Sequence, residues 1–122
     1  MNILILEDRW KVRLEVFVKY FPYAVIARRV RDLKRRAIRG EWDLAFLDYD
    51  LDQAPGYDGK NGGVGAQWIA RERPNIKRII IHSTNDRGAK KIADALRHHY
   101  KIERIPFPDL KRRLKRDGPE NL

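Results

Sequence analysis

The segment Ile3-Leu4-Ile5-Leu6-Glu7-Asp8 decides the fold class, because four consecutive aliphatic residues run directly into two acids. An uninterrupted apolar run of this length is typical of a strand buried on both faces of a parallel sheet. Two further runs repeat the pattern, Leu44-Ala45-Phe46-Leu47 and Ile79-Ile80-Ile81, and each is followed at once by polar residues. We therefore expect a parallel sheet whose strands end in polar side chains.

Amphipathic segments separate these runs. Residues 9–20 place Trp10, Leu14 and Phe17 at helical spacing, and the opposite face is charged, with Lys11, Arg13, Glu15 and Lys19. Trp10, Phe17 and Trp68 are expected in the core. Further helices are expected at 32–39, 66–72, 87–99 and 109–117, and weaker strands at 23–27 and 102–107. This alternation predicts one doubly wound α/β domain over residues 1–122, with its core at about 2–107 and a basic C-terminal helix at 109–117.

The composition limits the class of protein. The chain has 122 residues, with 27 Lys and Arg against 17 Asp and Glu, which gives a formal net charge of +10. The absence of cysteine excludes disulfides, thiolate catalysis and zinc sites built on cysteine. No apolar run approaches the ~20 residues that span a bilayer, and the first residues do not form a secretory signal, so we expect a cytoplasmic protein that does not enter membranes.

Polar side chains with ligand and catalytic chemistry follow three of the strands. They are Glu7 and Asp8, then Asp48 and Asp50, then His82, Ser83, Thr84 and Asn85. In open α/β sheets the carboxyl ends of parallel strands lie at one edge, where ligands bind. Clustered carboxylates repel each other, and a divalent cation such as Mg²⁺ or Mn²⁺ relieves that repulsion. The predicted site therefore suits metal-dependent phosphoryl chemistry.

Three segments carry a family resemblance: ILILEDR at 3–9, LAFLDYDLD at 44–52 and RIIIHSTND at 78–86. In order, spacing and strand-end residues they resemble the response-regulator receiver domain. The resemblance implies a five-stranded parallel, flavodoxin-like sheet in the order 2-1-3-4-5, with helices on both faces. In that family an acid pair binds metal, an aspartate accepts phosphate and a Ser or Thr ends the fourth strand. The matching positions are Glu7 and Asp8, Asp48, and Ser83 or Thr84.

One departure from signalling receivers points to a particular branch. Signalling receivers carry a lysine before the proline of the fifth strand, whereas here Ile105 precedes Pro106. The segments LDYDLD at 47–52, GGVGAQWIA at 62–70 and HSTNDRG at 82–88 more closely resemble the receiver-like domains proposed to process cyclic phosphates. Tyr49 stands where that branch has a histidine.

The resemblance implies the following roles. Asp8, Asp48, the carbonyl of Asp50 and, through water, Glu7 hold Mg²⁺ or Mn²⁺. Asp48 is nucleophile or metal ligand, His82 moves the proton, and Ser83 and Asn85 orient the phosphoryl oxygens; Ser83, Thr84 and Arg87 contact the phosphate. The implied function is a phosphoesterase for cyclic or terminal phosphates of nucleotides or RNA ends.

Several of these residues have a structural alternative. Glu7 could pair with an arginine, and Asn85 could cap a helix. His82 could be a core residue, since strand alternation opposes placing His82 and Ser83 on one side. The segment 53–65, with five glycines, is either a lid or a flexible crossover.

Two other functions stay open. One is a phospho-accepting receiver of two-component signalling. The other is a phage or mobile-element accessory protein that binds nucleic acid, since basic clusters at 28–39 and 111–116 favour non-specific phosphate contacts. The expected partners are thus a phosphorylated small molecule or a nucleic-acid end.

Overall fold

The computed structural model describes all residues, 1–122. Its main sheet contains five parallel strands in the spatial order β2-β1-β4-β6-β7. These strands are β1 (Ile3–Leu6), β2 (Val25–Ala27), β4 (Leu44–Leu47), β6 (Arg78–Ile81) and β7 (Lys101–Arg104). Numbered along the chain, this order is 2-1-3-4-5, so the predicted fold class is confirmed.

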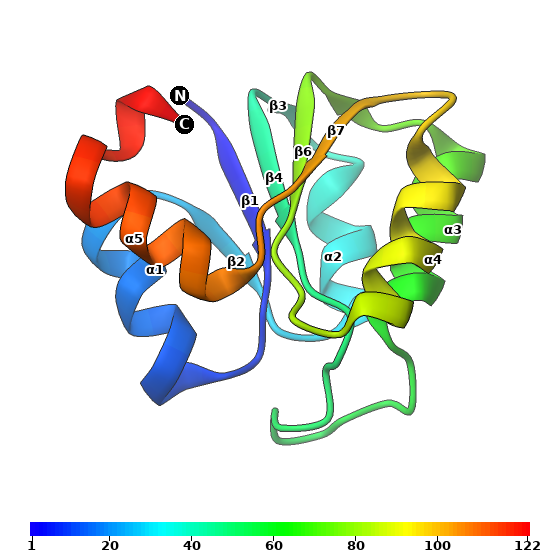
Figure 1. The fold of residues 1–122 in the computed structure, drawn as a ribbon. Coiled ribbons are helices and arrows are strands. Elements are labelled where there is room, and N and C mark those ends of the chain that lie inside the picture. Colours follow the sequence, from blue (N-terminus) through cyan, green and yellow to red (C-terminus); the bar gives the residue numbers. More distant parts are fainter.

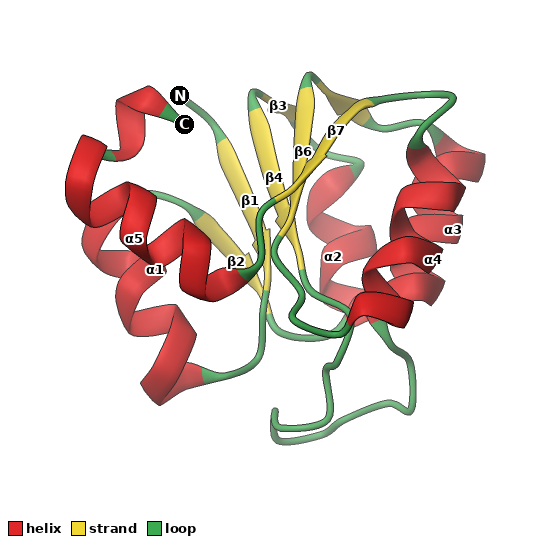
Figure 2. Ribbon diagram, viewed as in Figure 1, coloured by secondary structure: helices red, strands yellow, loops and turns green.

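Helices cover both faces of this sheet (Figures 1 and 2). On one face lie α1 (Glu15–Tyr20), the π-helix η1 (Trp10–Leu14) that precedes it, and α5 (Phe107–Asp117). The other face carries α2 (Val30–Ala37), α3 (Gly62–Glu72) and α4 (Asp86–Leu96). A short 3₁₀ helix, η2 (Pro119–Asn121), follows α5. None of these helices has the length and apolar character needed to cross a membrane.

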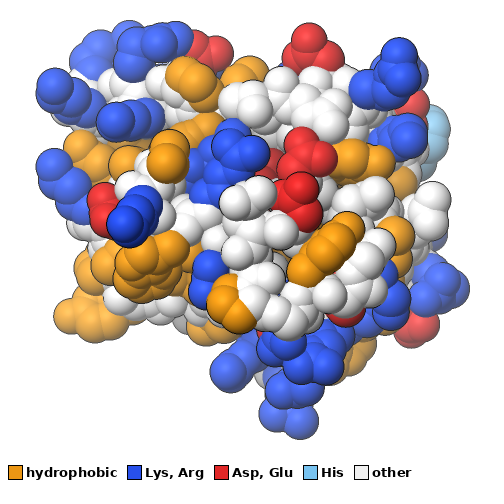
Figure 3. Space-filling view, turned by 90° about the horizontal axis from the view of Figure 1, so that it is seen from below, with side chains coloured by type: hydrophobic (Ala, Val, Ile, Leu, Met, Phe, Trp, Pro, Cys, Tyr) orange, Lys and Arg blue, Asp and Glu red, His pale blue; other side chains and the backbone are white.

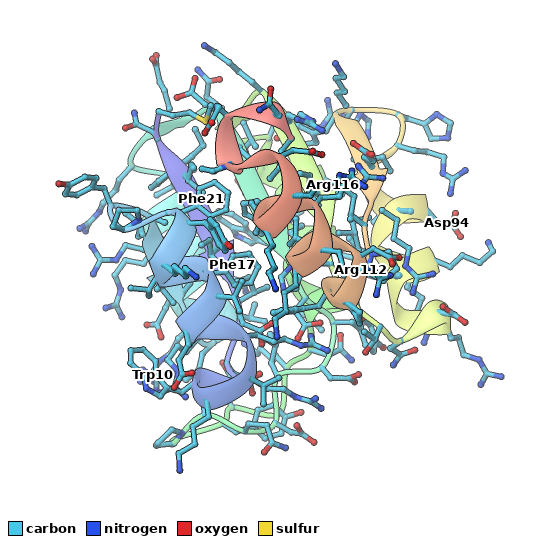
Figure 4. All side chains as sticks on the ribbon, turned by 60° about the vertical axis from the view of Figure 1, so that its left-hand side comes forward. Trp10, Phe17, Phe21, Asp94, Arg112 and Arg116 are labelled. Atoms are coloured by element: carbon cyan, nitrogen blue, oxygen red, sulfur yellow. The ribbon has the colours of Figure 1, made fainter.

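The strands divide the core into two clusters, because successive side chains point to opposite faces of the sheet. Leu4 and Leu6 pack on the side of α2, α3 and α4, whereas Ile5 packs on the side of α1 and α5. All three are 0% exposed. Phe17 of α1 and Phe21, directly after that helix, fill the second cluster between the helix and the sheet (Figure 4). Each such burial contributes about 1.5–3 kcal/mol.

The structure adds elements and shifts boundaries. A second, two-stranded parallel sheet joins β3 (Glu41–Trp42) to β5 (Asn75–Ile76), which the sequence reading missed. Helix α3 begins at Gly62, earlier than the predicted 66, because Asn61 caps it: Asn61 Oδ1 accepts hydrogen bonds from the amides of Gly63 and Val64. The last helix starts at Phe107, directly after Pro106.

The helix after β1 starts with a wide turn. The Leu14 N–H donates to the carbonyl of Arg9, five residues back, at 3.0 Å. This turn changes the direction in which its first side chains point. Trp10 is 55% exposed, so its prediction as a core residue is wrong, whereas Arg13 is only 6% exposed although it was expected on the charged face. Figure 4 shows Trp10 at the end of this helix.

Candidate functional site

Six polar side chains are buried at or near the carboxyl ends of β1, β4 and β6. They are Glu7, Asp8, Arg13, Asp48, His82 and Ser83, and none is more than 6% exposed. Buried polar groups are uncommon and call for partners. Figure 3 looks onto this end of the molecule, where carboxylates lie near the middle and Lys and Arg side chains lie on several sides of them.

Glu7 and His82 form a buried pair. Strand β6 ends at Ile81, so His82 is the first residue beyond it, and its Nε2 lies 2.9 Å from Glu7 Oε1. The imidazole also stands edge-on to the Phe17 ring, with the centroids 5.0 Å apart. Its Nδ1 has no hydrogen-bond partner. His82 is thus both a core residue and a partner of the acid cluster, and it reaches the site through Glu7.

Arg13 is a functional residue that the sequence reading missed. Its Nη1 lies 3.2 Å from Asp48 Oδ2 and 3.4 Å from Glu7 Oε1, and its Nη2 donates to Thr84 Oγ1 at 3.2 Å. The guanidinium carbon lies 5.3 Å from the centre of the Phe107 ring. The Arg13 guanidinium therefore neutralises two buried carboxylates and links them to Thr84.

Asp8 faces away from this pair. Its Oδ2 accepts hydrogen bonds from the amides of Gln53, at 2.5 Å, and Ala54, at 3.2 Å. Ligand atoms of Glu7, Asp48 and His82 lie within 4.8 Å of one another, and Asp8 is outside that group. Asp8 therefore anchors the loop after β4, while Glu7 faces the imidazole.

Asp48 keeps one oxygen free. Its Oδ1 accepts from the amide of Tyr49 at 2.9 Å, while Oδ2 has no hydrogen-bond partner, because Arg13 is close to it without the alignment of a hydrogen bond. Asp8 Oδ1 is likewise buried without a partner. Two carboxylate oxygens at neighbouring strand ends are thus available to a ligand.

The three acids differ in their pKa. Burial raises the pKa of Asp48 to about 6, helped by the charge of Glu7 and opposed by His82 and Arg13. Burial also raises the pKa of Asp8, against the amides of Gln53 and Ala54. For Glu7 burial acts in the same direction, but the hydrogen bond and charge of His82 outweigh it and hold the pKa below its ordinary value.

These residues fit a divalent cation. The free oxygens of Asp8 and Asp48 are hard ligands of the kind that Mg²⁺ and Mn²⁺ prefer, and a Glu, Asp and His group lies beside them. Asp50 was expected to bind the metal through its backbone carbonyl. Its side chain is exposed and accepts a hydrogen bond from Asn85 Nδ2 at 3.3 Å. Arg13 supplies positive charge at the same carboxylates.

The residues after β6 take separate positions. Ser83 is buried, and its Oγ accepts from the amide of Asn85 at 3.1 Å. Thr84 is exposed and holds Arg13. Asn85 caps α4, where its Oδ1 accepts from Gly88 N at 2.9 Å. Arg87 is exposed. Asn85 therefore caps a helix, which was the structural alternative for this residue, and it also donates a hydrogen bond to Asp50.

The ring of Tyr49 leaves no room for a side chain at two positions, Gly63 and Gly88. A Cβ on Gly88 would lie 2.3 Å from Cγ of Tyr49, and one on Gly63 would lie 3.0 Å from its ring. A Cβ on Gly62 would lie 1.8 Å from the carbonyl oxygen of Asp48. The ring of Tyr49 is thus seated between the first turns of α3 and α4, where Asn61 Nδ2 donates to its hydroxyl at 3.1 Å. These glycines fix the backbone around Asp48.

Comparison with known proteins agrees with this geometry. The family described as "Cyclic-phosphate processing Receiver domain" matches residues 3–98. The chain belongs to this family. No curated protein matches the chain. Ile105, the residue before Pro106, is 1% exposed and packs in the core.

Solved receiver structures share its fold at low sequence identity. A CheY-like receiver from Methanospirillum hungatei is 18% identical, with a TM-score of 0.61 over 93% of this chain and 90% of the other. A Francisella response regulator receiver domain is 17% identical, with a TM-score of 0.63 and 93% of each chain covered. The Thermotoga maritima response regulator TrrA, in complex with Mg²⁺ and BeF, is 21% identical, with a TM-score of 0.59 over 93% and 96%.

Proposed function

We propose that this receiver domain uses Mg²⁺ or Mn²⁺ to open cyclic phosphates of nucleotides or RNA ends. The observation that carries the proposal is the Glu7–His82 pair beside the free oxygen of Asp48. A phospho-accepting aspartate alone needs no buried imidazole held against a neighbouring carboxylate. Membership of the cyclic-phosphate processing family supports the same reaction class.

The free oxygens of Asp8 and Asp48 are the ligands for the cation in this proposal. A bound divalent cation supplies Lewis acidity and neutralises charge on phosphoryl oxygens. Arg13 lies 3.2 Å from Asp48 Oδ2 without metal; displaced from that oxygen by a cation, its guanidinium would supply a second positive charge for the phosphoryl oxygens. Thr84, exposed and bonded to Arg13, is the hydroxyl at the rim that can reach a phosphoryl oxygen.

Ring opening consumes one water: one P–O bond forms, the ring P–O bond breaks, and a proton moves from the water to the leaving sugar oxygen. Glu7 is the carrier of this proton, because its carboxylate lies beside Asp48 and contacts His82. His82 is a positioning residue, since it is completely buried and touches Glu7 rather than the surface. Its hydrogen bond sets the charge and orientation of that carboxylate.

Substrate entry requires the loop after β4 to move. Asp8 and Asp48 are 1% and 2% exposed, and residues 53 and 54 donate both of their amides to Asp8 Oδ2. Both amides bind Oδ2, so Asp8 holds the loop closed while its Oδ1 would remain for a cation. The loop therefore acts as a lid whose closure depends on Asp8.

The test is ³¹P NMR of adenosine 2′,3′-cyclic phosphate incubated with the protein and Mg²⁺ or Mn²⁺. We expect ring opening by the wild type, none with EDTA, and at least 100-fold slower opening by Asp48→Asn. The exposed neighbour Asp52→Asn is the matched control and keeps the wild-type rate. No opening with either metal, or the same rate in Asp48→Asn, contradicts the proposal.

A phospho-accepting receiver is the second candidate. The buried Asp48 with one unpartnered oxygen favours it, as does the likeness to response-regulator receivers in fold. Intact-mass analysis after incubation with acetyl phosphate and Mg²⁺ tests it. One added phosphoryl group that is absent in Asp48→Asn supports this candidate, and an unmodified wild type rejects it.

A further inference from the structure

A pocket lined by arginines adjoins the acid site. It lies at the carboxyl end of β2, encloses about 390 Å³, and is walled by α2 on one side and by Ala54 and Pro55 of the lid on the other. Its charged residues are Arg28, Arg29, Asp32, Arg35 and Arg36, so four cations face one acid. Lys and Arg side chains gather in the lower part of Figure 3, the side on which α2 lies.

The pocket is joined to the site by direct contacts. Arg28 Nη2 donates to the backbone carbonyl of Asp8 at 2.8 Å, and Arg28 Nε is buried without a partner. The amide of Ala54 binds Asp8 Oδ2 while its side chain lines the pocket. Arg29 stands against Gly56, where an added Cβ would lie 3.0 Å from Nη1. Asp8 therefore contacts both a pocket residue, Arg28, and a lid residue, Ala54, which links the pocket to the proposed cation site.

The pairing of its arginines distinguishes this pocket from the other basic surface. The groove along α5 contains four arginines, and each is paired with a carboxylate: Arg104 with Asp86, Arg112 with Asp109, Arg113 with Glu103 and Arg116 with Asp117. In the pocket beside Asp8 only Arg29 has such a partner, Asp32 at 3.0 Å. Arg35 and Arg36 are exposed and unpaired. Unpaired guanidinium groups bind phosphate in a two-pronged geometry.

We infer that this pocket binds the phosphodiester next to the reacting group, so that an oligonucleotide end is bound and opened in preference to a mononucleotide, which still reacts. This inference rests on the proposed function, because it takes the terminal phosphate to lie at Asp48. The pocket supplies charge and no set of hydrogen-bond acceptors for a base edge, so it reads the backbone and not the sequence. Arg35 and Arg36 face the incoming strand, and Arg28 holds the phosphate nearest Asp8.

The experiment compares two double variants that each remove two positive charges from an exposed helix surface. R35A/R36A alters the pocket, and R112A/R116A alters α5. Fluorescence anisotropy measures binding of a tetraribonucleotide that ends in a 3′-phosphate, and a mononucleotide 3′-phosphate competes with it. Neither ligand contains a ring to open, so the readout does not depend on catalysis.

We expect the preference for the tetranucleotide over the mononucleotide to fall at least ten-fold in R35A/R36A and to stay within two-fold in R112A/R116A. The slope of log affinity against log salt should fall in R35A/R36A by about 0.7 for each lost phosphate contact. Equal losses in both variants, no loss in either, or the same loss with a tetra-aspartate peptide as ligand overturn the inference.

The two hypotheses fail in different ways. If the wild type opens no cyclic phosphate but R35A/R36A loses the oligonucleotide preference, the proposed reaction is wrong and the phosphate pocket stands. If the wild type opens cyclic mononucleotides and cyclic-ended tetranucleotides with equal efficiency, and R35A/R36A opens both at the same ratio, the reaction stands and the pocket is wrong. A tetradeoxyribonucleotide should show the same loss as RNA, because the pocket contacts phosphates.

Discussion

Nε2 of His82 lies 2.9 Å from Oε1 of Glu7, and both side chains are 0% exposed. A carboxylate buried in this way needs compensation, because moving a charge out of water is costly. The imidazole, the amides of Asp8 and Arg9, and the guanidinium of Arg13 provide it. This pair binds the end of β1 to the end of β6, across β4, and so holds the acid cluster together.

Removal of His82 should destabilise the fold. His82→Ala leaves a cavity beside Phe17 and takes the hydrogen bond from Glu7, so we expect a loss of about 3 kcal/mol in the free energy of unfolding. Urea denaturation measures it. Combining His82→Ala with Glu7→Gln should cost less than the sum of the two, by at least about 1 kcal/mol. Additive effects contradict a direct pair. The exposed His98→Ala, as control, should change stability by less than about 0.5 kcal/mol.

Arg13 should compete with divalent cations for Asp48. Arg13→Ala leaves Glu7 and Asp48 without their cation, so we expect a lower melting temperature in EDTA. Mg²⁺ should then raise the melting temperature of Arg13→Ala more than that of the wild type, because it replaces the lost charge. Differential scanning fluorimetry with a Mg²⁺ titration measures both. The exposed Arg9→Ala is the control, and an equal Mg²⁺ response in all three proteins refutes the competition.

The raised pKa of Asp48 predicts a pH dependence of stability. Its folded pKa, about 6, lies above the ordinary aspartate value of 3.8, so the folded state binds the proton more tightly than the unfolded chain does. In the absence of metal this group therefore lowers stability above pH 6, and the loss is recovered as the pH falls from about 6 to 4. Asp48→Asn should raise stability at pH 7.5 by about 2 kcal/mol and leave it unchanged near pH 4. A destabilised Asp48→Asn at pH 7.5 contradicts the assigned burial cost.

The close packing of Tyr49 against Gly88 can be tested by creating a steric clash and then removing the ring. Gly88→Ala places a methyl group 2.3 Å from Cγ of Tyr49, so we expect a loss of about 2–3 kcal/mol. Tyr49→Ala removes the ring but keeps the Cβ, 2.8 Å from the added methyl group, so Gly88→Ala in that background should cost less but should not become neutral. Urea denaturation of the two single variants and the double variant gives the coupling. A full cost of Gly88→Ala in the Tyr49→Ala background is the result that refutes the clash.

The sheet and the convergence of its acids could be predicted because they depend on short-range patterns. Uninterrupted aliphatic runs such as Ile3 to Leu6 fix buried strands, and parallel pairing carries their carboxyl ends to one edge. Strand alternation also predicted that His82 and Ser83 would not lie on one side. It could not say that β6 ends at Ile81, which frees His82 to turn toward Glu7 while Ser83 turns to Asn85.

Arg13 and Trp10 were placed incorrectly for one physical reason. Their positions were assigned with the period of an α-helix, whereas the segment begins with a π-turn that contains more residues. Arg13 is thereby turned toward Asp48, and Trp10 is turned out to solvent. Nothing in the spacing of this segment signals that turn, in which the amide of Leu14 donates to the carbonyl of Arg9. The unpaired state of Arg35 and Arg36 likewise depends on where carboxylates lie in three dimensions.

The most direct test of the central claim is a crystal soaked with Mn²⁺ and measured for anomalous scattering. We expect a Mn²⁺ peak that contacts Asp8 and Asp48, with Arg13 moved from its place beside Asp48. A protein that opens cyclic phosphates in the presence of Mn²⁺ while its crystals show no metal at these carboxylates, and Arg13 still paired with Asp48, would contradict it.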